Sequence, residues 1–87
     1  MAKNPFGKTN IKWPYAVYED PRTGWRWEIL KTYKTRAREE RDPYARWFVK
    51  AYSPYVPNGE MGDTYRNEIR KNGMLVEATE EWREVYG

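Results

Sequence analysis

The clearest pattern in the chain runs from Tyr44 to Tyr52, where small or apolar residues occupy every second position. Successive side chains of a β-strand point to opposite faces, so the segment predicts a strand with two unlike faces. The face with the character of a core carries Ala45, Trp47, Val49 and Ala51. The opposite face, in which aromatic and basic groups interleave, carries Tyr44, Arg46, Phe48, Lys50 and Tyr52. This second face is a candidate binding surface.

The preceding residues predict a β-hairpin. A short β-type run at residues 15–19 is followed by a turn at 20–24 and a longer run at 25–33. Pro21 fixes φ and Gly24 permits a positive φ, as tight turns require. In the longer run, alternation places Trp25, Trp27 and Ile29 on one face, and Arg26, Glu28 and Thr32 on the other. Such alternation favours a strand paired with the first run.

The composition of two stretches predicts irregular structure. Residues 34–42 are almost wholly charged and have no apolar stripe, so we expect an exposed connection with one helical turn at 36–41. Residues 53–59 contain Pro54 and Pro57, which lack the N–H groups that a β-ladder needs.

The segment that follows has two competing interpretations. Asp63 is suited to cap a helix over residues 64–72 that ends at Gly73. Alternatively, Asn72-Gly73 forms a hairpin turn and residues 74–77 pair with 65–70. We favour the helix.

A short terminal helix is predicted after Thr79, whose side chain is suited to cap it. Glu80 and Glu81 then lie near its positive end, and Trp82 and Val85 share one side. Trp82 is interpreted as a core residue, with a role as a partner-docking side chain as the alternative.

These elements predict one small α+β domain at residues 14–87, preceded by an N-terminal arm at 1–13. The expected order is β-β-β-α-α, with a three-stranded antiparallel sheet and one or two short helices on one face. Eighty-seven residues leave no room for a second core.

Composition argues against an enzyme. The chain has no Cys and no His, which removes thiol nucleophiles, the commonest general base and the commonest metal ligand. Carboxylate pairs such as Glu39/Glu40 lie in polar runs and do not face each other on a helix. No catalytic residue, metal site, cofactor or small-molecule substrate is indicated. Without a signal-peptide pattern or an apolar run of membrane-spanning length, a cytoplasmic protein is expected.

The distribution of charge and the aromatic content indicate which class of partner the protein binds. Residues 1–50 hold 12 Lys and Arg against 6 Asp and Glu, whereas 51–87 hold 4 against 7. The acidic second part argues against indiscriminate binding along DNA. Five Trp and eight Tyr exceed what one small core needs, which favours a non-enzymatic protein that binds another protein or itself.

The candidate binding residues lie on the aromatic-basic strand face and its neighbours: Tyr44, Arg46, Phe48, Lys50, Tyr52, Arg26 and Lys34. One alternative is a nucleic-acid-binding module, in which bases stack on the rings and cations meet phosphates. Other interpretations are that the protein's own helices cover this face, or that a homodimer pairs it with its twin.

Four segments together resemble parts of small uncharacterised proteins encoded by actinobacterial phages. They are Trp25-Arg-Trp-Glu-Ile-Leu-Lys31, Asp42-Pro-Tyr-Ala-Arg-Trp-Phe48, Gly62-Asp-Thr-Tyr65 and Glu81-Trp-Arg-Glu-Val-Tyr-Gly87. The resemblance implies a location in the host cytoplasm and an accessory role in which the protein engages a host or phage macromolecule. It implies no active residue, and the arm at 1–13 lies outside it.

Overall fold

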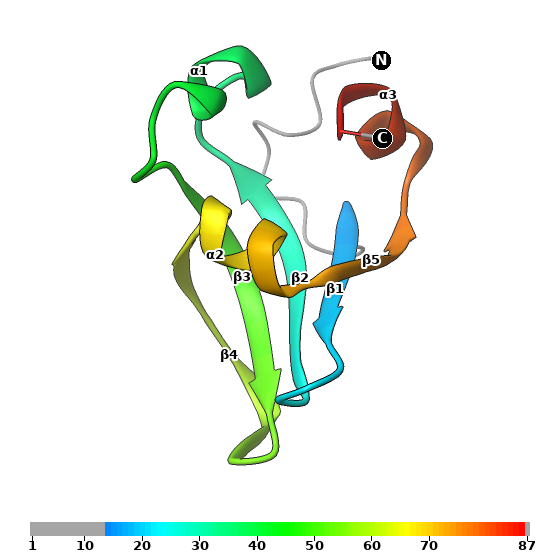
Figure 1. The fold of residues 1–87 in the computed structure, drawn as a ribbon. Helices are drawn as coiled ribbons and strands as arrows, with labels where there is room; N and C mark the ends of the chain where they lie inside the picture. The colour runs from blue at the N-terminus through cyan, green and yellow to red at the C-terminus, as the bar shows by residue number, and fades with distance from the viewer. Residues whose placement is uncertain (1–13, 87) are drawn as a thin grey trace.

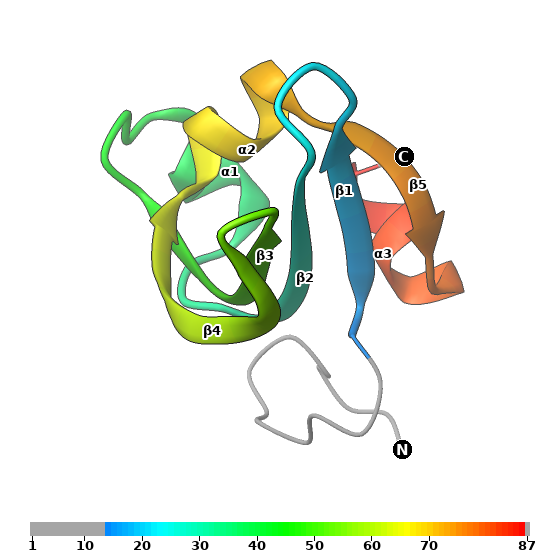
Figure 2. The same ribbon diagram turned by 90° about the horizontal axis from the view of Figure 1, so that it is seen from below.

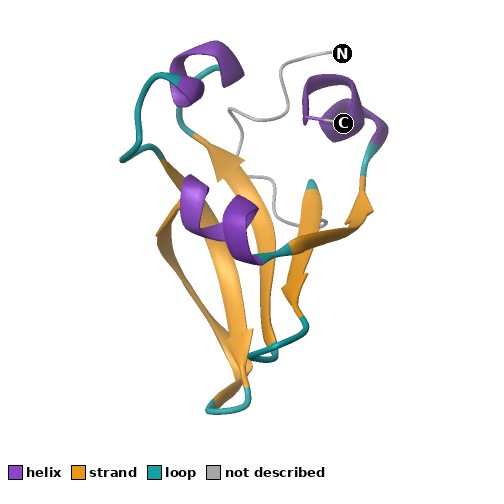
Figure 3. Cartoon of the chain, viewed as in Figure 1, coloured by secondary structure: helices purple, strands orange, loops and turns teal. Residues whose placement is uncertain are grey.

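The computed structural model describes residues 14–86, so the predicted arm at 1–13 lies outside the described residues. Within them, the chain forms five strands and three short helices (Figures 1 and 3). In chain order the elements are β1 (Ala16–Asp20), β2 (Trp25–Thr32), α1 (Arg36–Glu40), β3 (Arg46–Ser53), β4 (Val56–Tyr65), α2 (Arg66–Asn72), β5 (Met74–Ala78) and α3 (Glu80–Tyr86).

The strands form one sheet in the order β4-β3-β2-β1-β5, and every neighbouring pair is antiparallel. The α+β class is therefore confirmed. The prediction of three strands and at most two helices was wrong, because two further strands extend the sheet at its two edges. The hairpin of β1 and β2 has the expected turn, in which Gly24 takes a φ of 83° and its N–H donates to the Asp20 carbonyl.

Strand β4 replaces the irregular segment predicted at 53–59. It forms one edge of the sheet, and its register with β3 is interrupted between the pairs Ala51↔Glu60 and Ser53↔Val56. Pro57 falls within this interruption, where a missing N–H breaks no regular ladder. The prolines therefore mark a bulged edge rather than the absence of a strand.

The segment after β4 combines parts of both interpretations. Residues 66–72 are helical as favoured, but the helix begins at Arg66. Asp63, predicted as its cap, and Thr64, predicted as its first residue, lie instead in β4, which ends at Tyr65. The Gly73 N–H donates to the Ile69 carbonyl and ends α2. Residues 74–78 form a strand, but they pair with β1 and not with 65–70. Helix α2 thus carries the chain from one edge of the sheet to the other (Figure 2).

The core lies on the face of the sheet that the helices cover, which we call the inner face. The core members that come from β1, β2, β3, α2 and α3 include Tyr18, Trp27, Ile29, Trp47, Val49, Ile69, Trp82 and Tyr86, and Tyr15 joins them from the residue before β1. The predicted core face of residues 45–51 is confirmed, since Ala45, Trp47 and Val49 are buried and Ala51 packs against the cluster.

The predicted helix after Thr79 is also confirmed. The Thr79 hydroxyl accepts a hydrogen bond from the Trp82 N–H (3.2 Å) and donates one to the Tyr15 carbonyl. Trp82 is fully buried, which favours its role in the core.

Candidate binding surface

The opposite face of the sheet, called the outer face here, carries the predicted strand residues. Arg46, Phe48, Lys50 and Tyr52 follow the alternation of β3 and point away from Trp47 and Val49. Arg26 stands directly opposite Tyr52 in the antiparallel register, so it shares this face. The buried side chains of α1, α2 and α3 pack on the inner side, and these outer residues remain partly or fully exposed.

Two of the predicted residues lie beyond the strands. Tyr44 precedes β3 and is 72% exposed, and its ring meets the Tyr65 ring edge-on at a centroid distance of 6.3 Å. Through Tyr65 it borders the outer face, because Tyr65 stands opposite Arg46. Lys34 follows β2, and its Nζ lies 2.5 Å from Asp42 Oδ2. Lys34 therefore closes the loop around α1 and does not extend the outer face.

The structure adds residues that the sequence pattern missed. A register shift between Ile29 and Lys31 places Lys31 opposite Phe48 on the outer face and turns Thr32 inward, opposite Trp47. The expectation that Thr32 shares a face with Arg26 was therefore wrong, since a bulge reverses the alternation. From β4, Met61 and Tyr65 also join the outer face, where Met61 is 52% exposed.

Carboxylates offset part of the positive charge on this face. Arg26 donates to Glu19 Oε2 (2.7 Å), and its second terminal nitrogen lies 3.5 Å from Glu28 Oε2. The Tyr52 hydroxyl donates to Glu28 Oε1 (3.2 Å). Burial alone lowers the pKa of Arg26, but the hydrogen bond that Arg26 donates to Glu19 and the negative charge of Glu28 raise its pKa overall. The face therefore presents both signs of charge.

The Tyr52 ring is held in place from β4. Gly59 has a φ of 82°, and a Cβ added to it would lie 2.6 Å from Tyr52 Cε2 and 2.9 Å from Lys50 Cε. The Lys50 ammonium lies 5.6 Å from the Tyr52 ring centroid, within cation–π distance. Only a glycine allows the strand backbone and these two side chains to approach so closely.

A hollow of about 510 Å³ lies at the hairpin end of this face. It is lined by Glu19, Asp20, Pro21, Gly24, Trp25, Arg26, Tyr52, Ser53, Pro54 and Pro57. Arg26 and Tyr52 thus belong both to the open face and to a concave site beside it. Hollows of this kind next to exposed rings are where interface side chains are anchored.

At the other end of the outer face, Tyr33 contacts β4. Its hydroxyl donates to Asp63 Oδ1 (2.6 Å), although half of the side chain is exposed. Burial, followed by the hydrogen bond to Asp63, raises the pKa of Tyr33 to about 12. Asp63, predicted as a helix cap, instead ties the end of β2 to β4.

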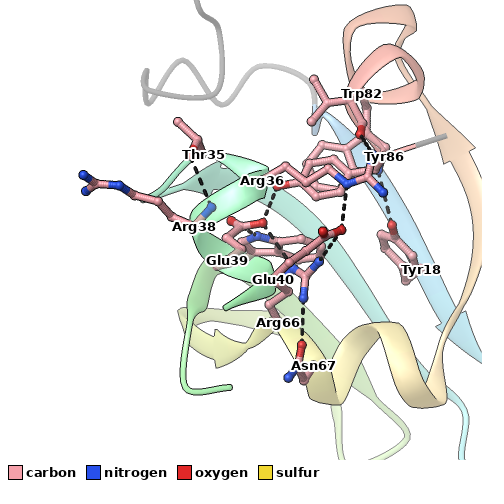
Figure 4. A network of polar contacts seen from close by, with 12 residues as sticks. Tyr18, Thr35, Arg36, Arg38, Glu39, Glu40, Arg66, Asn67, Trp82 and Tyr86 are labelled. Atoms are coloured by element: carbon pink, nitrogen blue, oxygen red, sulfur yellow. Dashed lines mark hydrogen bonds and ion pairs between the residues drawn. The ribbon is translucent and has the colours of Figure 1, made fainter. Parts of the chain in front are cut away.

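The most strongly buried polar group lies on the inner side, at Glu39 of α1 (Figure 4). Its Oε2 accepts the Trp47 indole N–H (2.7 Å), and its Oε1 accepts the Tyr86 hydroxyl. Arg66 Nε lies 3.2 Å from Oε1 in an ion pair rather than an aligned hydrogen bond. The expectation of a wholly exposed charged connection was wrong at this residue, because Glu39 is 1% exposed.

Around Glu39 the aromatic rings form one cluster. Trp82 stacks on Tyr86 at a centroid distance of 4.3 Å, and Trp47 meets Trp82 edge-on at 5.0 Å. The Trp82 indole also donates to the Tyr18 hydroxyl (3.3 Å). Burial, then the hydrogen bond to Glu39, raises the pKa of Tyr86. Solvent does not reach the Glu39 carboxylate. Because the cluster contains side chains from all three helices and from β3, its contacts hold α1, α2 and α3 on the sheet.

Within residues 14–86, no group of three or more acidic side chains is placed to share a metal ion. No helix of this described part is long and apolar enough to cross a membrane. Comparisons with family models, curated proteins and solved structures found no match to the chain.

Proposed function

We propose that the chain is a non-enzymatic interaction protein and that its outer face binds another protein, with a second copy of this chain as the partner. The observation that carries the proposal is the set of at least partly exposed aromatic and basic residues, with one methionine, on the sheet face opposite the helices: Arg26, Arg46, Phe48, Lys50, Tyr52, Met61 and Tyr65. Aromatic residues, Met and Arg are enriched where proteins contact each other.

The distribution of charge supports a twin chain as the partner. A two-fold interface brings the same patch of both subunits together, so a patch must be complementary to itself. Glu19 and Glu28 lie beside Arg26 on this face, and Lys50 stands opposite Glu28 in the register. A rotated copy can therefore place carboxylates against cations.

A nucleic-acid-binding module is the second candidate. It is favoured by the exposed Arg46 and Tyr44 and by Lys50 and Phe48 beside them. Bases could stack on these rings, each stack contributing about 1–3 kcal/mol. The carboxylates at Glu19 and Glu28 oppose this role, because they repel phosphates.

An accessory role in a phage-infected cell, and a cytoplasmic location there, belong to the proposal as hypotheses. They rest on the resemblance of segments within residues 25–87 to phage-encoded proteins. They assign no role to any residue.

Sedimentation and oligonucleotide titration separate the two candidates. We expect the wild-type chain to dimerise between about 10 and 500 µM, and Phe48→Ala to weaken the dimer about tenfold, as for an interface hot spot. Val76→Ala is the control, because Val76 is an exposed apolar side chain of β5, at the opposite edge of the sheet from β4. Tryptophan fluorescence with single- and double-stranded oligonucleotides should show no binding at moderate salt. Salt-dependent oligonucleotide binding by a monomer would contradict the proposal.

A further inference from the structure

A second hollow, of about 390 Å³, lies on the inner face at the hairpin end of the sheet. It is lined by Asp20, Thr23, Trp25, Trp27, Ala51, Thr64, Glu68 and Asn72. These residues come from β1, β2, β3, β4, α2 and the β1–β2 turn, so the hollow lies where α2 leaves the sheet uncovered. Its volume is within the range of ordinary ligand pockets.

The hollow exists because small residues occupy the inner face here. Ala51 follows Trp47 and Val49 on the inner side of β3, and it leaves the space that a larger side chain would fill. On the neighbouring strand, Gly62 stands opposite Val49, and a Cβ added to it would meet no atom within 4 Å. The packing of the core therefore stops short of the hairpin end.

A pair of stacked indoles forms the apolar wall. The rings of Trp25 and Trp27 are nearly parallel, with an interplanar angle of 10° and a centroid distance of 6.2 Å. Trp27 is buried, whereas Trp25 is 38% exposed. A flat, partly exposed indole face attracts planar groups, and cations above all.

The charged side chains that line the hollow are both acidic. Asp20 is 4% exposed, accepts a hydrogen bond from the Arg22 backbone N–H, and has the Arg22 Nε 3.6 Å from its Oδ1, so part of its charge is already paired. Glu68 projects from α2 and is exposed, and its carboxylate accepts a hydrogen bond from Asn72 (3.3 Å). No Lys or Arg is among the residues that line this hollow. The charge therefore complements a cation.

We propose that this hollow binds an arginine side chain of a protein ligand, whose guanidinium stacks on Trp25 and pairs with Glu68. A guanidinium is planar, so it can stack on an indole and donate to a carboxylate at the same time. An ammonium presents a compact charge and stacks less well. The site opens on the inner face, although it shares Asp20 and Trp25 with the hollow at the hairpin end of the outer face. Glu68 and Asn72 line the inner-face hollow alone, so substitutions on α2 distinguish this site from the proposed self-association surface.

The direct test is an NMR titration of the full chain with Nα-acetyl-arginine amide, followed at the Trp25 indole N–H signal. Nα-acetyl-citrulline amide is the matched probe, because it has nearly the same shape without the charge. We expect a saturable shift with the arginine probe, at millimolar affinity, and at least fivefold weaker binding of the citrulline probe. No saturable shift up to about 100 mM, or equal binding of the two probes, would overturn the proposal.

Variants locate the site. Glu68→Gln keeps the length and the acceptor of an exposed side chain, and should weaken the arginine probe about threefold or more. Glu84→Gln changes another exposed glutamate, on α3 and outside the lining of the hollow, and should leave the affinity unchanged. Ala51→Leu should fill the hollow and abolish the shift. If Ala51→Leu does not fold, the Glu68→Gln variant provides the test. An unchanged affinity of Glu68→Gln for the arginine probe would contradict the assignment of the site to this hollow.

Discussion

The two faces of the sheet are both rich in aromatic residues, yet the rings on each face have different surroundings. On the inner face, Trp47 and Tyr86 donate to the buried Glu39 and lie almost fully out of solvent. On the outer face, Phe48 and Tyr52 are half-buried and keep part of each side chain at the surface. A high aromatic content therefore has two physical causes in this chain: a small core built from large rings, and a second surface that the core does not use.

The largest expected effect of a single substitution is on the inner face, at Glu39. Glu39→Ala removes the acceptor of Trp47 and Tyr86 and leaves the buried Arg66 without its carboxylate. We expect a loss of about 3–5 kcal/mol in the free energy of unfolding, measured by urea denaturation. Its exposed neighbour is the control, and Glu40→Ala should cost less than about 1 kcal/mol. Equal effects would show that the buried cluster does not stabilise the fold.

A pair of tyrosines compares the buried cluster on the inner face with an exposed residue at the border of the outer face. Tyr86→Phe removes a hydroxyl that donates to the buried Glu39, and should cost about 1–3 kcal/mol of stability. Tyr44→Phe removes an exposed hydroxyl and should change stability by less than about 0.5 kcal/mol. Thermal unfolding followed by circular dichroism measures both. A smaller loss of stability in Tyr86→Phe than in Tyr44→Phe would contradict the stabilising role of the hydrogen bond to Glu39.

Two glycines of β4 offer a test of the outer face. Gly59→Ala forces a positive φ on alanine and places its Cβ against Tyr52, so it should cost about 1–2 kcal/mol. It should also displace the Tyr52 ring and weaken binding through the outer face. Gly62→Ala meets open space at an ordinary φ and should stay within about 0.5 kcal/mol of wild type. Chemical denaturation of the two variants would contradict this account if their stabilities were the same.

The smallest effect is expected from the Tyr33–Asp63 contact. The folded pKa of Tyr33 is raised to about 12, above its ordinary value of about 10. Its contribution is therefore fully present below about pH 10 and is lost as the pH rises through about 12. Because half of the side chain is exposed, the contribution should stay under about 1 kcal/mol.

Ultraviolet absorbance measures this ionisation as the difference between wild type and Tyr33→Phe. Asp63→Asn should move the midpoint of Tyr33 towards about pH 10, because it removes a negative charge next to the phenol. An unchanged midpoint in Asp63→Asn would show that the hydrogen bond does not set the pKa.

Period-two alternation was sufficient to predict the inner faces of β2 and β3. Trp27, Ile29, Trp47 and Val49 are buried as expected, because each strand is regular over these positions. The same reasoning failed beyond Ile29, where a bulge reverses the faces and no local residue signals it.

Longer-range features could not be predicted from the sequence pattern. The register interruption that accommodates Pro57 arises from the pairing of β4 with β3, which the local sequence does not show. In the same way, residues 74–78 form a strand because they pair with the free edge of β1. Glu39 lies in a charged run with no apolar periodicity, and its partners Trp47, Arg66 and Tyr86 are brought to it only by the fold. Alternation along β3 was enough to predict that Arg46, Phe48, Lys50 and Tyr52 share one face. It could not predict that Met61 and Tyr65 of β4 lie beside them, because that depends on how β3 and β4 pair.

The most direct test of the central claim is an NMR dilution series of the uniformly ¹⁵N-labelled chain, from about 1 mM to about 20 µM. If the outer face is the contact surface, backbone signals that change with concentration should cluster at Arg46, Lys50, Tyr52 and Met61, and the same series on Phe48→Ala should show much smaller changes. Spectra that do not change with concentration, or changes confined to the exposed edge strand Met74–Ala78, would contradict it.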